Sequence, residues 1–348
     1  MESSIIFNII FPFSILDSLW LAPLALLLDL ALGDPALPWP HPVCLIGRAL
    51  DFLEAPVCKY ARLAQKFPGK EVTGKIPGAL CLLLCAAGSW LLVMAACNLP
   101  IIGPFFALYI AWAGLAAGCL LDTGKIVLAR IETGSITEGR EAMSWLVTRD
   151  TSQMDKNSLR KTLADTMSEN FTDAFVAPFF WLLFLGPAGL WIYKTVSTFD
   201  SRWGYLTEKW AASGWAGARA DDLLAWLPAR LAPFLLWACH GMHRFIGHAP
   251  WLGCWPGYAM IRKQARTMTS PNSGWAMAAC AWLCNGRMAG PDRYFGAIVQ
   301  KGWLGPDIRD AKDWTETRLS ALFSLIRLAV AEGGLIMWLF ALGLVLLF

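Results

Sequence analysis

The segment Asp165–Trp181 contains the carboxylates whose spacing is most suggestive of chemistry. Its sequence, DTMSENFTDAFVAPFFW, holds Glu169, Asn170 and Asp173 close together and then becomes apolar. Glu169 and Asp173 are four residues apart, so an α-helix would place both on one face. Two carboxylates held together beside low-dielectric material repel each other unless a cation or a proton joins them. The pattern indicates a metal-phosphate or acid–base site at a bilayer surface, or else a solvated helix start with acidic residues in its first turns.

The composition is that of an integral membrane protein. The chain is 56% hydrophobic and 16% charged, with a mean hydropathy of +0.48, whereas soluble domains carry about a quarter charged residues. Four apolar runs are long enough to cross lipid, and two more are interrupted by proline, glycine or arginine, which predicts broken helices. The clean runs are 16–32, 79–97, 101–121 and 328–348; the interrupted runs are 171–193, with Pro178, Gly186 and Pro187, and 223–240, with Pro228, Arg230 and Pro233. The predicted fold is an all-α integral membrane protein: a polytopic helical bundle with broken or re-entrant helices and cytoplasmic helical loops.

The distribution of lysine and arginine predicts the orientation in the membrane. Residues 1–47 contain neither, and nothing after Arg327 is basic. The positive-inside rule therefore places three basic loops, at about 41–77, 122–170 and 241–327, in the cytoplasm and both termini outside. An even number of crossings follows, so the two interrupted runs either both cross or neither does. We expect one polytopic domain over residues 1–348 in the cell inner membrane.

Cysteine and histidine offer candidate metal ligands without a standard metal motif. The pairs Cys81–Cys85 and Cys280–Cys284 have helical spacing and could bind metal, but small apolar packing residues are the favoured interpretation. Three histidines follow Cys239 without a zinc spacing, and interfacial packing is favoured for them. They are His240, His243 and His248. No nucleic-acid-binding motif is present.

Other polar residues gather more densely than ordinary loops require. Asp29 lies inside the first apolar run, where a lone charge costs about 2.5–3.5 kcal/mol, so we expect it to face the bundle interior in either a functional or a structural role. Polar clusters outside the helices supply carboxylates for Mg²⁺, cations for phosphates and amides for orientation, a set that suits phosphoryl-group chemistry. The clusters are Gly33–Pro35 with His41, Arg149–Gln153, Ser168–Asp173, Lys194–Tyr205, Gly214–Asp222 and Ser270–Trp275.

These clusters, in this order, resemble the adenosylcobinamide-phosphate synthase family of cobalamin biosynthesis. The matching strings are LLLDLALGDPALPWPHPVCLIGR, RDTSQMD, SENFTDAFVAPFFW, YKTVSTFDSRWGY, GWAGARADDLLAWLPARL, SPNSGW and GPDRYFG. They extend from about residue 24 to 296 and cover most of the chain. Each string alone is weakly diagnostic, whereas the combination is specific.

The resemblance implies a membrane-bound ligase. Family members join the propionate of adenosylcobyric acid to aminopropanol, or to its phosphate, with ATP and Mg²⁺, giving adenosylcobinamide or its phosphate. The corrinoid is therefore a substrate, the lipid bilayer is the environment, and other corrinoid-pathway enzymes are candidate partners. Because ATP is cytoplasmic, the resemblance places the active site on the cytoplasmic side. It favours a topology in which neither interrupted run crosses fully, with 171–193 dipping into the membrane and returning near Gly186.

Residue type and motif membership together assign hypothetical roles. The candidate catalytic residues are Glu169, Asp173, Asp200 and Lys194. The candidate metal-facing carboxylates are Glu169, Asp173, Asp200 and Asp221, with Asp222 as an alternative to Asp221. The candidate substrate-binding residues are Arg149, Asn170, Arg219, Asp222, Ser270, Asn272 and His41. Cations among them would neutralise phosphates, and amides and hydroxyls would orient substrate. For His41, a turn or a substrate contact is expected.

The chain departs from the family pattern at two positions. Ser197 stands where asparagine is more usual, and Leu206 where lysine is. The second change removes a cation, which leaves the choice of amine substrate open. Trp203, Trp215 and Trp275 could form apolar walls for the corrin or act as interfacial anchors, and anchors are favoured.

Two other classes of protein compete with the enzyme. One is a non-catalytic membrane sensor or accessory protein of the same superfamily, against which the many retained ionisable groups argue. The other is a transporter, for which broken helices and an intramembrane Asp29 would be ordinary. No internal repeat is evident, and the basic loops are long for a compact carrier.

Overall fold

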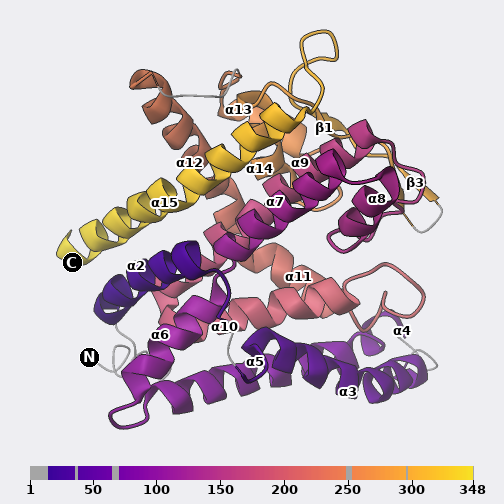
Figure 1. Ribbon diagram of the computed structural model, residues 1–348. Coiled ribbons are helices and arrows are strands. Elements are labelled where there is room, and N and C mark those ends of the chain that lie inside the picture. Colours follow the sequence, from indigo (N-terminus) through magenta and orange to yellow (C-terminus); the bar gives the residue numbers. More distant parts are fainter. Residues whose placement is uncertain (1–14, 36–37, 65–69, 248–252, 295–296, 348) are drawn as a thin grey trace. The chain divides into compact units, whose positions relative to one another are not determined.

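The computed structural model describes residues 15–35, 38–64, 70–247, 253–294 and 297–347, nearly all of them helical (Figure 1). By their contacts the residues form two compact units. Unit 1 comprises Met1–Leu115, Ala177–Leu224 and Trp338–Phe348, and unit 2 comprises Ala116–Val176 and Ala225–Met337. The all-α class is confirmed. The single membrane domain expected over the whole chain stays a prediction.

Unit 1 is built around one helix, α10. Its members are α2 (Ile15–Leu32), α3 (Pro42–Ala64), α4 (Lys70–Thr73), α5 (Ile76–Cys97), α6 (Gly103–Gly114), α10 (Ala177–Trp203) and α11 (Trp215–Leu224), with the end of α15. α10 packs against α2, α3, α5, α6 and α11. Its large side chains Phe179, Tyr193 and Phe199 are fully buried, so burial of this apolar helix supplies much of the hydrophobic stabilisation of the unit.

The break predicted at Gly186 and Pro187 is present inside α10. Gly186 has φ 65° and ψ −165°, so the helix is kinked there. Glycine accepts positive φ without a steric penalty, and the following proline cannot donate the helical hydrogen bond. The helical stretch Lys156–Trp203 nevertheless remains long and apolar enough to cross a membrane. Re-entrance of this segment stays a prediction.

Unit 2 combines helices with two short strand pairs. Its helices are α7 (Ala117–Thr133), α8 (Ile136–Ser144), α9 (Lys156–Phe171), the π-helical turn η1 (Thr172–Val176), α12 (Trp226–Phe245), α13 (Tyr258–Ala265), α14 (Gly274–Leu283) and most of α15 (Glu316–Leu347). Strand β1 (Met288–Ala289) pairs antiparallel with β4 (Trp303–Leu304), and β2 (Asp292–Tyr294) pairs antiparallel with β3 (Ala297–Val299). The fully apolar α14 packs against α9, α12 and α13.

Local sequence signals start two of these helices. Ser135 and Glu138 form a capping box at the beginning of α8. Asp155 caps α9, because its carboxylate accepts a 2.7 Å hydrogen bond from the amide of Ser158. Such caps satisfy amides that have no partner within the helix. The second cap fixes the start of the helix that carries Asp165 and Glu169.

The described residues contain four helical stretches long and apolar enough to cross a membrane, or five if the bent pair α11 and α12 counts as one. They are Ile76–Cys97, Gly103–Thr133, Lys156–Trp203 and Glu316–Leu347. The protein is therefore a multi-pass membrane protein. Asp29 is fully buried in unit 1, as expected for a carboxylate within an apolar helix.

Two breaks fall at positions that the sequence did not indicate. The run 101–121 is divided at Leu115 and Ala116, where α6 ends and α7 begins. The run 223–240 breaks at Ala225, whereas Pro228 and Pro233 lie within α12. Pro228 is tolerated because the first-turn amides of a helix have no intrahelical acceptor.

Candidate functional site

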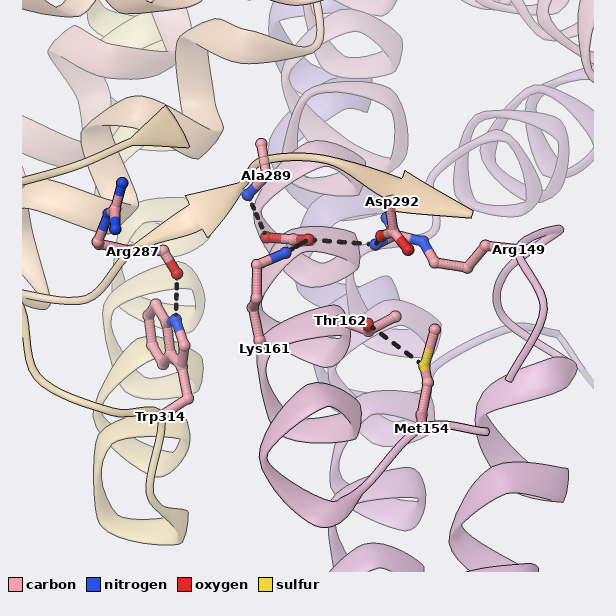
Figure 2. A network of polar contacts seen from close by, with 9 residues as sticks. Arg149, Met154, Lys161, Thr162, Arg287, Ala289, Asp292 and Trp314 are labelled. Atoms are coloured by element: carbon pink, nitrogen blue, oxygen red, sulfur yellow. Dashed lines mark hydrogen bonds and ion pairs between the residues drawn. The ribbon is translucent and has the colours of Figure 1, made fainter. Parts of the chain in front are cut away.

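A buried carboxylate, Asp165, organises the polar interior of unit 2. Its Oδ2 accepts from Arg149 Nη1 at 3.3 Å and from Lys161 Nζ at 3.0 Å, and its Oδ1 accepts from the Ala289 amide at 2.9 Å. Arg149 also forms an ion pair with Asp292. We call these five residues the Asp165 network. Figure 2 shows Arg149, Lys161, Ala289 and Asp292 gathered around the central carboxylate.

The predicted RDTSQMD motif positions this network. Asp150 turns the chain by accepting a 2.9 Å hydrogen bond from the Ser152 amide, and the Thr151 hydroxyl donates to the Arg140 carbonyl. Met154 lies 3.7 Å from the Thr162 hydroxyl, as Figure 2 shows. The motif therefore forms a turn that positions Arg149 beside Asp165 of the following helix, α9.

Further charges surround the Asp165 network. The partly exposed Glu169 interacts electrostatically with Lys301, Arg149 and Asp165. The Arg287 guanidinium lies 4.2 Å from the centre of the Trp303 ring, and the Lys161 ammonium lies 5.5 Å from it. Cations over an indole face are stabilised by its quadrupole.

Two hollows meet at Lys161 and Trp303. One, of about 410 Å³, is lined by Asp150, Thr162 and Asp292 among others. The other, of about 270 Å³, is lined by Arg287 and Lys312. The buried Arg287 Nε has no hydrogen-bond partner among the described residues. Lys161 and Arg287 therefore offer positive charge to an anionic ligand in this part of unit 2.

The expected pairing of Glu169 and Asp173 on one helical face stays a prediction, because the type of helix changes between the two residues. The α-helix ends at Phe171, and Thr172–Val176 form a π-helical turn. In a π turn each hydrogen bond spans five residues, so the turn is wider than the 3.6-residue spacing assumed. Such turns are frequent at functional sites. Glu169 belongs to α9 and Asp173 to the π turn.

The predicted substrate-orienting residues Ser270 and Asn272 lie in the turn just before α14. Asn272 is buried, and its side-chain oxygen accepts a 2.9 Å hydrogen bond from Arg230 Nη1. Its backbone amide donates to the Ser270 hydroxyl at 3.2 Å. Arg230 also lies over the Trp226 and Trp275 rings. This motif therefore binds Arg230, which the sequence analysis considered only as an interruption of an apolar run.

Unit 1 contains the second charged group, which we call the Asp200 cluster: Asp200, Arg219, Asp221 and Asp222. Asp200 lies in the last turn of α10 and interacts electrostatically with Asp222 of the neighbouring α11. Arg219 and Asp222 form an ion pair of 3.8 Å. The two helices pack together, and Gly217 permits this because a Cβ there would lie 2.2 Å from the Phe199 ring.

Gly204 makes room for the Asp200 carboxylate. A Cβ at Gly204 would lie 2.0 Å from Asp200 Oδ1, a separation that no real side chain tolerates. The Gly204 amide also donates to the Asp200 carbonyl at 2.7 Å. The absence of a side chain at Gly204 therefore leaves room for the Asp200 carboxylate in its observed position.

His41 and Lys194 form a further part of unit 1. His41 lies just before α3, and its Nδ1 accepts a 3.3 Å hydrogen bond from the Val43 amide. Burial lowers the pKa of His41; Asp34 partly offsets that effect, and Lys194 adds to it. The imidazole is therefore biased towards its neutral form. This supports a turn role for His41 and places it near Lys194.

The structure corrects the expected roles of Trp203 and Trp275. Trp203 is fully buried and stacks on Trp210 with ring centres 5.1 Å apart, so it is neither a corrin wall nor an interfacial anchor. Trp275 is also buried and donates to the Pro271 carbonyl at 3.1 Å. Trp215 is 42% exposed. With 19 tryptophans in the chain, several fill the core.

The carboxylates of the Asp200 cluster are suited to a Mg²⁺ site in which water and substrate supply most of the ligands. Hard oxygen ligands are what Mg²⁺ prefers, and it usually keeps several waters while binding one or two carboxylates and substrate phosphates. Among the described residues, no three of the predicted metal-facing carboxylates come within ligand distance of one another. Asp200 and Asp222, which interact electrostatically, are the two carboxylates that such a mode would use.

The sequence analysis missed five ionisable residues: Lys161, Asp165, Asp292, Arg230 and Arg287. Asp165, Asp292 and Arg230 stand in or beside the family strings. Asp165 precedes SENFTDAF, Asp292 belongs to GPDRYFG, and Arg230 belongs to LPARL. Their place in or beside the family strings was the signal that could have identified these residues. Their pairing across long sequence separations could not be inferred from the sequence.

Fold and clusters together define a polytopic all-α membrane protein whose polar motifs gather carboxylates, cations and amides. The model of the CobD/Cbib protein family matches residues 22–323. This chain belongs to that family, which confirms the resemblance found in its motifs.

Named relatives agree with this assignment. The chain is 35% identical over 294 residues to the cobalamin biosynthesis protein CobD of Photorhabdus laumondii, covering 83% of this chain and 87% of that protein. It is 33% identical over 330 residues to CobD of Yersinia enterocolitica, covering 93% and 96%. It is 33% identical over 293 residues to the cobalamin biosynthesis protein CbiB of Salmonella typhimurium, covering 82% and 87%. No solved structure matches the chain.

Proposed function

We propose that this protein is a membrane-bound ligase of cobalamin biosynthesis. It joins the propionate of adenosylcobyric acid to aminopropanol or aminopropanol phosphate with ATP and Mg²⁺, and the product is adenosylcobinamide or its phosphate. Membership of the CobD/Cbib family and the names of the relatives support the pathway. The gathering of motif carboxylates and cations into the Asp200 cluster and the Asp165 network supports the chemistry.

The single observation that carries the proposal is the fixed Asp200 carboxylate beside Asp222. A non-catalytic scaffold gains nothing from two like charges held near each other, because their repulsion is unfavourable without a cation. The glycine that admits the Asp200 carboxylate lies in the same family string. The arrangement is that expected for a site that binds a metal together with phosphates.

The reaction requires the propionate to be activated. A propionate oxygen attacks the γ-phosphorus of ATP, the bond to ADP breaks, and an acyl phosphate forms. The amine then attacks the acyl carbon, inorganic phosphate leaves, and the nitrogen loses a proton as the amide forms. Catalysis of such steps consists mainly of positioning and charge neutralisation.

The charge of each candidate residue indicates which part of the reaction it would serve. Asp200, Asp221 and Asp222 would hold Mg²⁺, which neutralises phosphate oxygens when bound. Arg219 and Lys194 would bind phosphate oxygens in unit 1. In unit 2, Lys161 and Arg287 would bind an anionic substrate group, and Asp165 would position Lys161 and Arg149.

The test is an activity assay on detergent-purified protein. Adenosylcobyric acid, ATP and Mg²⁺ would be supplied with either amine, and mass spectrometry would detect the amide product. Amide formed with one amine and dependent on ATP would support the ligase. No product with either amine, while a family relative is active in parallel, would refute it and favour the non-catalytic membrane sensor or accessory protein.

A substitution at the exposed Leu206 can distinguish the two candidate amine substrates. Its side chain is 96% exposed, so a lysine at this position would be reachable by substrate. We expect Leu206→Lys to lower KM for aminopropanol phosphate while leaving KM for aminopropanol unchanged, because only the phosphate gains an ion pair. An equal change for both amines would exclude a phosphate contact at position 206.

A further inference from the structure

A cysteine, a histidine and a glutamate meet in unit 2, outside the Asp165 network. Cys239 and His243 belong to α12, and Glu332 belongs to α15. One ligand atom of each, a sulfur, a ring nitrogen and a carboxylate oxygen, lies within 4.8 Å of the other two. Elsewhere in the described ranges, no three such side chains converge in this way.

The sequence builds this convergence from two local features. Cys239 and His243 are four residues apart, so one face of α12 presents both, one turn apart. Gly333, next to Glu332, lets α15 approach α12 closely, because a Cβ there would already lie 3.3 Å from Leu235 Cβ. The close approach brings the glutamate to the cysteine and the histidine.

The electrostatics of the group favour a cation. His243 Nε2 lies 2.6 Å from Glu332 Oε1. The other oxygen, Glu332 Oε2, is buried and accepts no hydrogen bond from the described part of the chain. A buried carboxylate oxygen without a partner is unfavourable. The side chains of His243 and Glu332 retain 16% and 22% exposure, so the group is not sealed inside the protein.

We propose that Cys239, His243 and Glu332 bind a divalent transition-metal ion of the Zn²⁺ class. Sulfur, imidazole and carboxylate together are a zinc-type ligand set, and three protein ligands leave the fourth tetrahedral position for water. Ligand atoms bound to one Zn²⁺ stand about 3.3–3.8 Å apart, given bond lengths of about 2.0–2.3 Å. The observed separations, between 2.6 and 4.8 Å, bracket this range.

Binding requires only small side-chain rotations. The ion replaces the His243–Glu332 hydrogen bond with two coordinate bonds, and the Cys239 thiol releases its proton to solvent as the thiolate binds. The ion then joins α12 to α15. This site is independent of the ligase chemistry, so its presence can be tested without an activity assay.

The experiment uses full-length protein in detergent, treated with chelator and then titrated with Co²⁺ as a spectroscopic probe for Zn²⁺. We expect a thiolate-to-cobalt charge-transfer band that saturates at one equivalent, and a Tm that rises with Zn²⁺ because the ion binds the folded state. Cys239→Ser should abolish the band, and Glu332→Gln should weaken binding at least about tenfold. Cys254→Ser, which alters an exposed cysteine of the same unit, should leave the band unchanged.

Three results would overturn the proposal: no charge-transfer band in the wild-type protein, a band that persists in Cys239→Ser, or a band that disappears in Cys254→Ser. Glu332→Gln separates loss of metal binding from loss of folding, because glutamine has the shape of glutamate without its charge. If the Glu332→Gln protein remains folded by its Tm and binds Co²⁺ as tightly as the wild type, the three-ligand site is excluded.

Discussion

The Asp165 network of unit 2 and the Asp200 cluster of unit 1 differ in how their charges are balanced. Asp165 is 1% exposed and bonded to two cations and a backbone amide. The Asp200 cluster gathers three carboxylates with one arginine, whose ion pair is 3.8 Å long and exposed. A buried carboxylate bonded to several partners stabilises a fold only together with those partners, whereas carboxylates gathered nearer to solvent are more open to a ligand. The first group should therefore govern stability and the second activity.

The largest expected effect is on the buried network. Asp165→Asn should lower the free energy of unfolding by about 3–5 kcal/mol, because it leaves Lys161 without its buried counter-charge and Arg149 with Asp292 alone. Denaturant or thermal unfolding in detergent measures this. The matched control, Asp122→Asn, breaks an exposed pair with Lys125 and should change stability by less than about 1 kcal/mol. Equal stability of the two variants would contradict a structural role for the network.

The opposite result is expected in the Asp200 cluster. Asp200→Asn should reduce kcat/KM at least about 100-fold while leaving the unfolding free energy unchanged or slightly higher, because repulsion from Asp222 is relieved. The amide assay and unfolding in detergent measure the two quantities. Asp51→Asn, an exposed carboxylate of the same unit that is paired with Arg202, is the control and should retain activity. Retained activity in Asp200→Asn would remove this residue from the site.

A smaller effect should follow from moving the carboxylate without removing it. Gly204→Ala places a Cβ where Asp200 Oδ1 now lies, so we expect kcat/KM to fall about tenfold or more, since misplacement by about 1 Å can cost as much as 100-fold. Gly88→Ala, with no atom within 4 Å of the added Cβ, should leave activity unchanged. Identical kinetics of the Gly204→Ala and wild-type proteins would show that the carboxylate position is not critical.

The smallest effect concerns His41. Burial holds its pKa in the folded protein below the unfolded value of 6.5, so the unfolded state binds a proton more readily. The stability should therefore be constant above about pH 6.5 and decrease as the pH falls below it, by at most about 1.4 kcal/mol per pH unit. The difference in unfolding free energy between wild type and His41→Gln, measured from pH 8 to 5, isolates this contribution. A difference that is constant across this range would contradict the lowered pKa.

Much of the fold could be predicted because it depends on local properties of the chain. Hydropathy and length located the apolar runs at 79–97, 101–121 and 328–348, each of which lies within or overlaps an observed membrane-length helix. The kink at Gly186 followed from the Gly-Pro pair. The division at Leu115 was not predicted, because its only local signal is Gly114, and glycine is frequent within membrane helices.

The site could be predicted only as a set of residue types. The motifs identified Arg149, Asp200 and Asp222, and the structure places each in a charged group. The partners of Arg149 lie 16 and 143 residues away, and sequence spacing gives no information on such pairs. The π turn at Thr172–Val176 was not anticipated for a similar reason, since turn width depends on packing and hydrogen bonding in three dimensions.

The sequence by itself determined the membrane class, the main helices and the family, because hydropathy, helix length and motif strings are properties of neighbouring residues. Only the tertiary structure decided that Asp165 is the centre of a buried network, that Gly204 positions Asp200, and that Glu332 meets Cys239 and His243. The physical reason is that charges and ligand atoms act over a few ångströms in space, and packing brings those atoms together from distant parts of the chain.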